Sequence, residues 1–225
     1  MTILAVCGLT REAQIAGTDG VVAVAGGGDA EGLKKKLDAL HGDIRGVISI
    51  GLGGALSPLL KVGDVVIGER IVTESGSFTC DNTWRVLLAA RLAGSHQGAL
   101  YGSDIVLENA GAKSALFETS GGALAVDMES QVAARFAAER QLPLAALRVV
   151  SDDATHALPP AALVAMRPDG GISVGRVLWS LTKNPLQLPA LIRTGRGSSR
   201  AFKELLRCRR LLGSGLGFGL GGLDL

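Results

Sequence analysis

Two short apolar runs, each followed by a carboxylate, constrain the fold of this chain more than any other feature. Residues 123–126 lead into Glu129, and residues 144–150 lead into Asp152. Apolar residues between the two runs recur at helical spacing, so the pattern predicts strand, helix and strand. Ligands of open α/β sheets bind beyond the carboxyl ends of strands, which places both acids at an expected binding site. Alternatively, Glu129 is a first-turn acid that the helix dipole favours, and Asp152 is a turn residue.

The chain before these runs continues the alternation of strands and helices. Apolar runs within residues 1–8, 21–25, 46–50, 64–72 and 98–106 predict strands. Helices are expected to begin near Thr10, Ala30 and Asp81, with Thr10 and Asp81 as N-caps. A length of 225 residues suffices for one core. We therefore expect one α/β domain with a largely parallel sheet.

The composition excludes several classes of protein. With 47% apolar residues, 20% charged residues and 32 glycines, the chain is neither disordered nor fibrous. The apolar run at the N-terminus lacks basic residues and is too short for a signal peptide or a membrane span. Cys7, Cys80 and Cys208 lie far apart, with no His or Cys at metal-ligand spacing. We expect a protein of the reducing cytosol, without a zinc site.

The acidic motifs and a glycine-rich segment resemble those of one enzyme superfamily. Val126-Asp127-Met128-Glu129-Ser130, the Ser151-Asp152 pair, and Gly-Leu-Gly-Gly-Ala-Leu at residues 51–56 look like the purine nucleoside phosphorylase and methylthioadenosine nucleosidase superfamily. The resemblance covers roughly residues 1–155. It implies a three-layer α/β/α fold with a central mixed, mostly parallel sheet, in a catalytic domain over residues 1–175. It also implies cleavage of a purine nucleoside and a homo-oligomer.

Site roles follow from this resemblance. Asp152, next to Ser151, would protonate or hydrogen-bond N7 of adenine, a step typically worth roughly 10² to 10⁴ in rate. Glu129 would accept both ribose hydroxyls, and Met128 would pack on the sugar face. Val106 occupies the position that lies under the purine in the resembled family; alternatively, Val106 is a core residue. No metal is expected.

The identity of the nucleophile stays open at this point. Phosphorolysis requires cationic and N–H donors for phosphate, and Arg11 with the backbone at Gly53 and Gly54 could supply them. Hydrolysis requires a base for water, and Glu12 could serve. The alternative is a surface pair of Arg11 and Glu12 at a helix start. Apart from phosphate as a co-substrate, no cofactor is expected, because Leu56 replaces the third glycine of a dinucleotide fingerprint.

The C-terminal segment, residues 176–225, forms a basic helical extension. It carries nine Lys and Arg against two acidic residues, whereas residues 1–175 carry 14 against 19. In residues 200–212, basic side chains share one helical face, and Ala201, Leu205, Cys208 and Leu212 lie on another. This arrangement is typical of a helix that lies in a membrane surface, here the inner face of the membrane. A solvated face packed on the domain is the alternative, and nucleic acid is disfavoured because aromatic stacking platforms are missing.

Three functions are compatible with these patterns. Residues 8–13 and the basic tail are similar to the hopanoid-associated phosphorylases, which implies adenosylhopane, a lipid-linked adenine nucleoside, as the substrate. The second hypothesis is an enzyme that cleaves a soluble nucleoside, methylthioadenosine or S-adenosylhomocysteine. The third is a non-catalytic nucleoside-binding module, against which the presence of both Glu129 and Asp152 argues. The Pro- and Gly-rich segment 159–171 is expected to be a loop that could cover the site.

Overall fold

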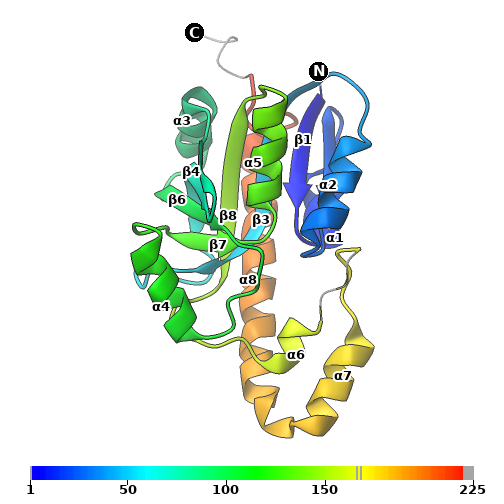
Figure 1. Cartoon of the computed structure of the whole chain (residues 1–225), viewed down its shortest axis with the longest axis vertical. Helices are drawn as coiled ribbons and strands as arrows, with labels where there is room; N and C mark the ends of the chain where they lie inside the picture. The colour runs from blue at the N-terminus through cyan, green and yellow to red at the C-terminus, as the bar shows by residue number, and fades with distance from the viewer. Residues whose placement is uncertain (1, 166, 168, 220–225) are drawn as a thin grey trace.

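The computed structural model describes residues 2–165, 167 and 169–219, and Figure 1 presents their arrangement. The elements in chain order are β1 (Thr2–Cys7), α1 (Thr10–Ala16), β2 (Val21–Ala25), α2 (Ala30–Asp38), β3 (Ile44–Ala55), β4 (Val65–Thr73), β5 (Gly76–Thr79), α3 (Asn82–Arg91), β6 (His96–Gly102), α4 (Ala110–Thr119), β7 (Ala125–Asp127), α5 (Ser130–Glu139), β8 (Leu144–Asp152), α6 (Pro160–Leu163), α7 (Val174–Lys183), the 3₁₀ turn η1 (Pro185–Gln187) and α8 (Leu188–Leu212). The predicted strand–helix–strand unit around Glu129 corresponds to β7, α5 and β8.

The strands form one mixed, mostly parallel sheet, as the sequence predicted. Five strand pairings are parallel: β1 with β2, β1 with β3, β3 with β8, β4 with β6, and β6 with β7. Three are antiparallel: β3 with β7, β4 with β5, and β4 with β8. The pairings therefore close a circuit through β3, β8, β4, β6 and β7. This closure brings the ends of β3, β7 and β8 together.

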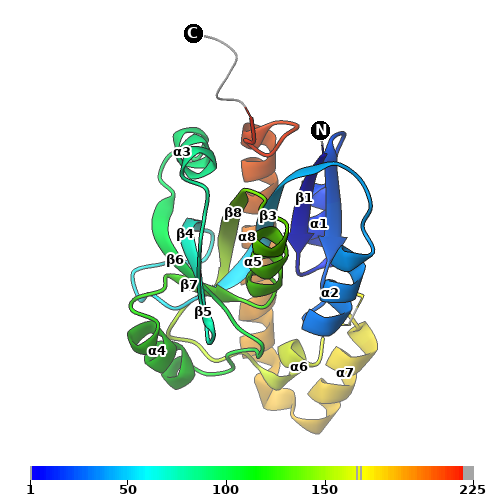
Figure 2. The ribbon, with the colours of Figure 1, turned by 45° about the horizontal axis from the view of Figure 1, so that its top comes forward.

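Helices cover both faces of this sheet, which confirms the three-layer architecture. Helices α2 and α5 pack on one face through side chains that include Leu33, Leu37 and Phe136. Helices α1, α3 and α8 pack on the other face, where Trp84 of α3 and Leu205 of α8 share a core with the strands. In Figures 1 and 2, α5 lies in front of the strands and α8 lies behind them.

The apolar side of the C-terminal helix packs on the sheet and is not available to lipid. Ala201, Leu205, Cys208 and Leu212 of α8 are all buried in the core that the helix shares with the strands. Beyond α8, Phe218 packs edge-on against Trp84, with ring centroids 4.7 Å apart. The prediction that the apolar side of residues 200–212 enters a membrane was wrong. An amphipathic pattern is the same whether the apolar side of a helix packs on a sheet or enters a bilayer. None of the described helices has the length and apolar character needed to cross a membrane.

Several element boundaries differ from those expected. Strand β3 does not end at Ile50 but continues through the glycine-rich segment to Ala55, because that segment pairs with β8 and β7. The predicted strand over residues 98–106 ends at Gly102. Thr10 is not an N-cap, and its hydroxyl instead donates to the carbonyl of Asp169. Asp81 does cap α3, accepting a hydrogen bond from the Trp84 amide at 2.8 Å.

Candidate active site

A pocket of about 410 Å³ lies beyond the carboxyl ends of β1, β3, β7 and β8. This position is where the strand pattern predicted chemistry. Of the nine predicted site residues, eight line the pocket: Glu12, Gly53, Gly54, Val106, Met128, Glu129, Ser151 and Asp152. The segment 158–165, which includes α6, contributes Leu158, Ala162 and Leu163 to the lining. The segment 159–171 was expected to be a loop that could cover the site. Part of it does border the site, but Pro160–Leu163 form helix α6, with proline at the first helical position, where a loop was predicted.

Arg11 is the predicted residue that does not line this pocket. Its side chain is exposed, and its guanidinium lies over the ring of Phe202 in α8, 4.4 Å from the ring centroid. A cation held on an aromatic face in this way stabilises the contact between α1 and α8. Phosphate binding by Arg11 stays a prediction, and the position of its side chain gives it no support.

Asp152 is held by a buried lysine. The ammonium of Lys113 lies 2.5 Å from Asp152 Oδ2, and the lysine side chain is 1% exposed. The Ser151 hydroxyl donates to the other oxygen, Oδ1, at 2.7 Å. Gly54 leaves room for the carboxylate, because a Cβ there would lie 3.0 Å from Oδ2. The pair thus fixes both oxygens of Asp152 in orientation.

Sequence reasoning missed Lys113, although a signal was present. The lysine stands among small residues in the first half of α4, Ala110-Gly111-Ala112-Lys113-Ser114-Ala115. A buried ammonium requires an opposite charge and acceptors. Besides Asp152, the backbone carbonyl of Asp153 accepts from Lys113 Nζ at 2.8 Å. A lone lysine in a helical segment of small residues therefore predicts a buried carboxylate as its partner.

Glu129 is the second acid of the pocket and is buried at the start of α5. Its Oε1 accepts a hydrogen bond from the Gly28 amide at 3.2 Å. Burial, reinforced by the nearby charges of Asp127 and Glu12, raises the pKa of Glu129 to about 8. At neutral pH the carboxyl group therefore carries a proton for much of the time. It can both donate to and accept from a diol.

The raised pKa of Glu129 makes protein stability depend on pH. The folded chain holds this proton up to about pH 8, whereas the unfolded carboxyl releases it near the ordinary value of 4.5. The stability from this group is thus fully present below pH 4.5 and is lost as pH rises toward 8. Its contribution to the free energy of unfolding falls by about 1.4 kcal/mol per pH unit in that window. We expect Glu129→Gln to flatten the slope measured by urea unfolding between pH 5 and pH 8. Equal slopes for the two proteins would contradict this assignment.

Glu12 is buried at the pocket wall and is held by three backbone amides. Its Oε2 accepts from Gly8 and Leu9 at 2.7 and 2.8 Å, and its Oε1 accepts from Leu52 at 2.9 Å. Gly51 gives this side chain room, because a Cβ there would lie 2.7 Å from Oε2. Burial raises the pKa of Glu12, and the three amides oppose that shift. A fixed carboxylate with a raised pKa suits a general base.

A buried ion pair joins the two acidic motifs from which the sequence argument began. Arg148 in β8 donates to Asp127 Oδ1 at 2.7 Å, and both side chains are almost fully buried. The same Asp127 oxygen accepts from the amides of Glu129 and Ser130, which begin α5. The pair therefore fixes where Glu129 lies relative to β8. Sequence reasoning counted Arg148 only as part of an apolar strand, although a charge in such a strand requires a buried partner.

The rest of the pocket lining is predominantly apolar. Leu158 and Leu163 come from the segment around α6, Ile172 and Val177 from α7 and the residues before it, and Leu191 from α8. These side chains lie on elements outside the predicted catalytic motifs. The pocket thus combines a wall with three carboxyl groups, from α1, the start of α5 and the end of β8, with a largely aliphatic wall on helices, to which α8 also contributes the hydroxyls of Thr194 and Ser198.

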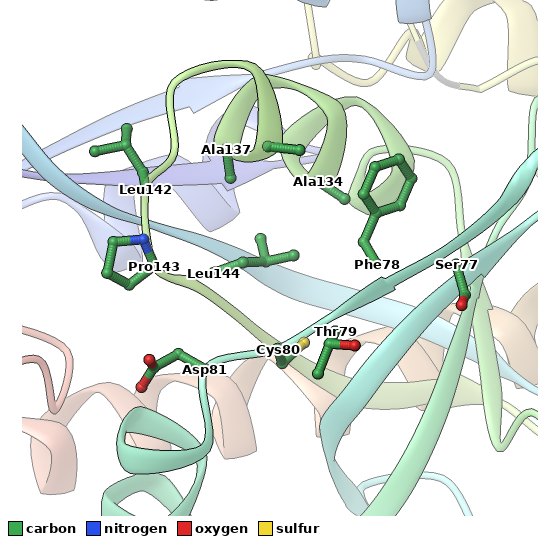
Figure 3. Close-up of a pocket in the computed structure, with 11 residues that line it drawn as sticks. Ser77, Phe78, Thr79, Cys80, Asp81, Ala134, Ala137, Leu142, Pro143 and Leu144 are labelled. Carbon is green, nitrogen blue, oxygen red and sulfur yellow. The ribbon is translucent and has the colours of Figure 1, made fainter.

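A second hollow lies between β5, α5 and the start of β8, and Figure 3 displays its lining. Its ionisable side chains are Cys80 and Asp81. Asp81 is engaged as the cap of α3. Burial raises the pKa of the Cys80 thiol to about 12. These groups are not available for acid–base chemistry, so the pocket at the strand ends is the candidate active site.

Comparison with known proteins agrees with this fold. A family model described as "Phosphorylase superfamily" matches residues 16–165, and no curated protein sequence matches the chain. The structure is similar to 5′-methylthioadenosine/S-adenosylhomocysteine nucleosidase from Streptococcus pneumoniae, with TM-score 0.60 and 19% identity over 92% of this chain and 99% of that chain. It is also similar to futalosine hydrolase of Helicobacter pylori, with TM-score 0.62 and 14% identity over 93% and 97% of the two chains. At these identities the likeness establishes the fold.

Proposed function

Because the chain belongs to the phosphorylase superfamily, we propose that it is an enzyme that cleaves the N-glycosidic bond of an adenine nucleoside. One observation carries the proposal: the carboxyl groups of Asp152, Glu129 and Glu12 line a single pocket. Adenine is favoured by the relatives, since the Streptococcus pneumoniae nucleosidase was solved with 8-aminoadenine. A mutant of the Helicobacter pylori nucleosidase was solved with 5′-methylthioadenosine in its active site.

The three acids match the three tasks of this reaction. Cleavage passes through a sugar cation, so the enzyme must neutralise the leaving base, hold the ribose and bring a nucleophile to the opposite face. We assign proton delivery to N7 of adenine to Asp152. The ion-paired carboxylate takes up that proton from the ammonium of Lys113, which also positions it. Glu129 binds the ribose hydroxyls beside Met128. Glu12 takes the proton of the attacking water.

Hydrolysis is favoured over phosphorolysis by the charges around the pocket. A phosphate ion requires cationic donors. Among the described residues that line the pocket, Lys113 is the cation, and Asp152 engages it. Arg11 contacts Phe202 and does not line the pocket. By contrast, Glu12 offers a fixed carboxylate to a water molecule.

The apolar wall supports a nucleoside with a large aliphatic 5′ substituent. The side chains of Leu158, Leu163, Ile172, Val177 and Leu191 offer no partner to the charged amino acid tail of S-adenosylhomocysteine. The polar side chains of this wall are the uncharged hydroxyls of Thr194 and Ser198. They match a hydrocarbon, whose transfer from water is worth roughly 25 cal/mol per Å². Adenosylhopane, expected from the resemblance, has this chemistry. Its cleavage would release adenine and a ribosyl-hopane.

The proposal is tested by incubating the purified protein with adenosine analogues that carry 5′ groups of increasing chain length. Methylthioadenosine and S-adenosylhomocysteine serve as soluble references. We expect adenine release without phosphate, a free sugar as the second product by mass spectrometry, and kcat/KM that rises with chain length. Release that requires phosphate would make the protein a phosphorylase and return attention to Arg11. A preference for the soluble references would remove the lipid-linked substrate, and no release from any substrate would overturn the enzymatic proposal.

A further inference from the structure

Helix α7 presents an apolar side that no other part of the described chain covers. It lies at the end of the molecule opposite α3, beside the start of α8 (Figure 1). None of its ten residues is buried. Seven of the fifteen large exposed apolar residues of the described chain fall between residues 172 and 192. A concentration of this kind marks an interaction surface.

Six of these side chains define what we call the apolar tip: Val174, Leu178, Trp179, Leu186, Leu188 and Ile192. The tip spans α7, η1 and the first turns of α8. Leu186 is 88% exposed and Trp179 is 65% exposed. The ammonium of Lys183 lies 5.1 Å from the ring centroid of Trp179. A tryptophan beside a lysine is an arrangement suited to the boundary between lipid and water.

A buried glutamine holds the tip in a fixed shape. Gln187 of η1 donates from Nε2 to the carbonyl of Ser180 in α7 at 2.8 Å. Its Oε1 accepts from the amide of Ala161 in α6 at 2.8 Å. These hydrogen bonds hold η1 against α6 and α7, so the apolar side chains of the tip are held in fixed positions relative to one another.

The charge around the tip has one sign. Residues 170–203 contain six Lys and Arg and no acidic residue. Within the described part of the chain, none of these six cations forms an ion pair. Clustered cations next to exposed apolar side chains complement an anionic lipid surface. They disfavour a second copy of the same basic surface as the partner.

The tip is continuous with the candidate active site. Ile172, which is exposed just before α7, also lines the pocket. Val177 of α7 and Leu191 of α8 line the pocket from the same two helices that carry the tip. A partner surface in contact with the tip would therefore lie next to the aliphatic side chains that line the pocket.

From the exposure, charge and position of the tip, we propose that it docks on an anionic membrane surface, with α7 lying in the plane of the interface. The side chains of the tip enter the boundary between headgroups and acyl chains, and the surrounding cations contact lipid phosphates. Docking of this kind requires no helix that spans the bilayer. It assigns membrane contact to residues 174–192 and leaves the apolar side of residues 200–212 in the core.

The proposal is tested by co-sedimentation of the full chain with vesicles of phosphatidylcholine alone and of phosphatidylcholine with 30% phosphatidylglycerol. We expect binding to the anionic vesicles that weakens when NaCl is raised from 0.05 to 0.5 M. We also expect a blue shift of tryptophan emission, because Trp179 is exposed while Trp84 is buried. Leu186→Asp should weaken vesicle binding by about tenfold or more, since it removes a leucine side chain that would enter the lipid and adds a negative charge.

Leu59→Asp is the matched control, because Leu59 is 82% exposed and lies outside the tip. It should bind vesicles like the wild type. Absence of vesicle binding by the wild type, or equal weakening by Leu186→Asp and Leu59→Asp, would overturn the proposal. A wild-type oligomer in light scattering that Leu186→Asp converts to monomer, without vesicle binding, would assign the tip to a second copy of the chain. The assay involves no turnover, so its outcome is independent of the proposed reaction.

Discussion

The Asp152→Asn variant is expected to lose turnover by about 10² to 10⁴ while it binds an adenine nucleoside with nearly unchanged affinity. Asparagine keeps the size of the side chain and its contact with the Ser151 hydroxyl, but it cannot give a proton to N7. The substitution also removes the counter-charge of the buried Lys113 ammonium, which lowers stability. Among the contacts with the nucleoside, however, the one that is lost exists mainly in the transition state, so kcat falls while the dissociation constant changes little. Single-turnover adenine release and calorimetric titration with a slowly cleaved analogue measure the two quantities separately.

Asp153→Asn provides the control for this substitution. Asp153 is the next residue along the chain, but its carboxylate contacts His156 Nδ1 at 2.6 Å and does not line the pocket. Turnover of this variant should match the wild type. Lys113→Met should also reduce turnover and should alter the pH profile of kcat, because the charge that positions Asp152 is removed. Wild-type turnover in Asp152→Asn, or an equal loss in Asp153→Asn, would exclude Asp152 from proton transfer.

The location of the site could be predicted because it depends on local pattern. Glu129 and Asp152 follow apolar runs whose length and order define strands, and strand ends in α/β sheets converge. Lys113 and Arg148 were not predicted, because their importance depends on partners far away in sequence. Lys113 pairs with a residue 39 positions later, and Arg148 pairs with one 21 positions earlier. Burial of both partners, which gives these ion pairs their effect, is a property of the folded chain.

The fold was predictable to the level of its layers, and the exceptions have physical reasons. The glycines of β3 favoured a turn after Ile50, but they continue the strand because Gly51 and Gly54 give room to Glu12 and Asp152. The amphipathic pattern of α8 is the same whether its apolar side meets a sheet or a membrane. Only packing distinguishes the two, and it places Leu205 and Leu212 in the core.

Glu12→Gln is expected to reduce water-dependent turnover by about 10² to 10⁴ and to remove the acidic limb of the pH–rate profile. The carboxylate of Glu12 must be ionised to accept a proton from water, and burial raises its pKa. Wild-type activity should therefore rise with pH until this group has lost its proton. Glutamine has no such titration. Its amide also leaves at least one of the three backbone N–H groups without an acceptor, so a stability loss of about 1–3 kcal/mol is expected.

The loss of a base is distinguished from the loss of structure by an anionic nucleophile. Azide needs no base, so it should restore sugar-product formation in Glu12→Gln, as an azido sugar, without restoring hydrolysis. Glu31→Gln is the matched control, because Glu31 is also a first-turn acid, in α2, but is exposed. It should leave the rate and the pH profile unchanged. If azide fails to restore turnover in a Glu12→Gln protein that remains folded by circular dichroism, or if the acidic limb persists, Glu12 is not the base. The water would then have to be activated by another group of the pocket.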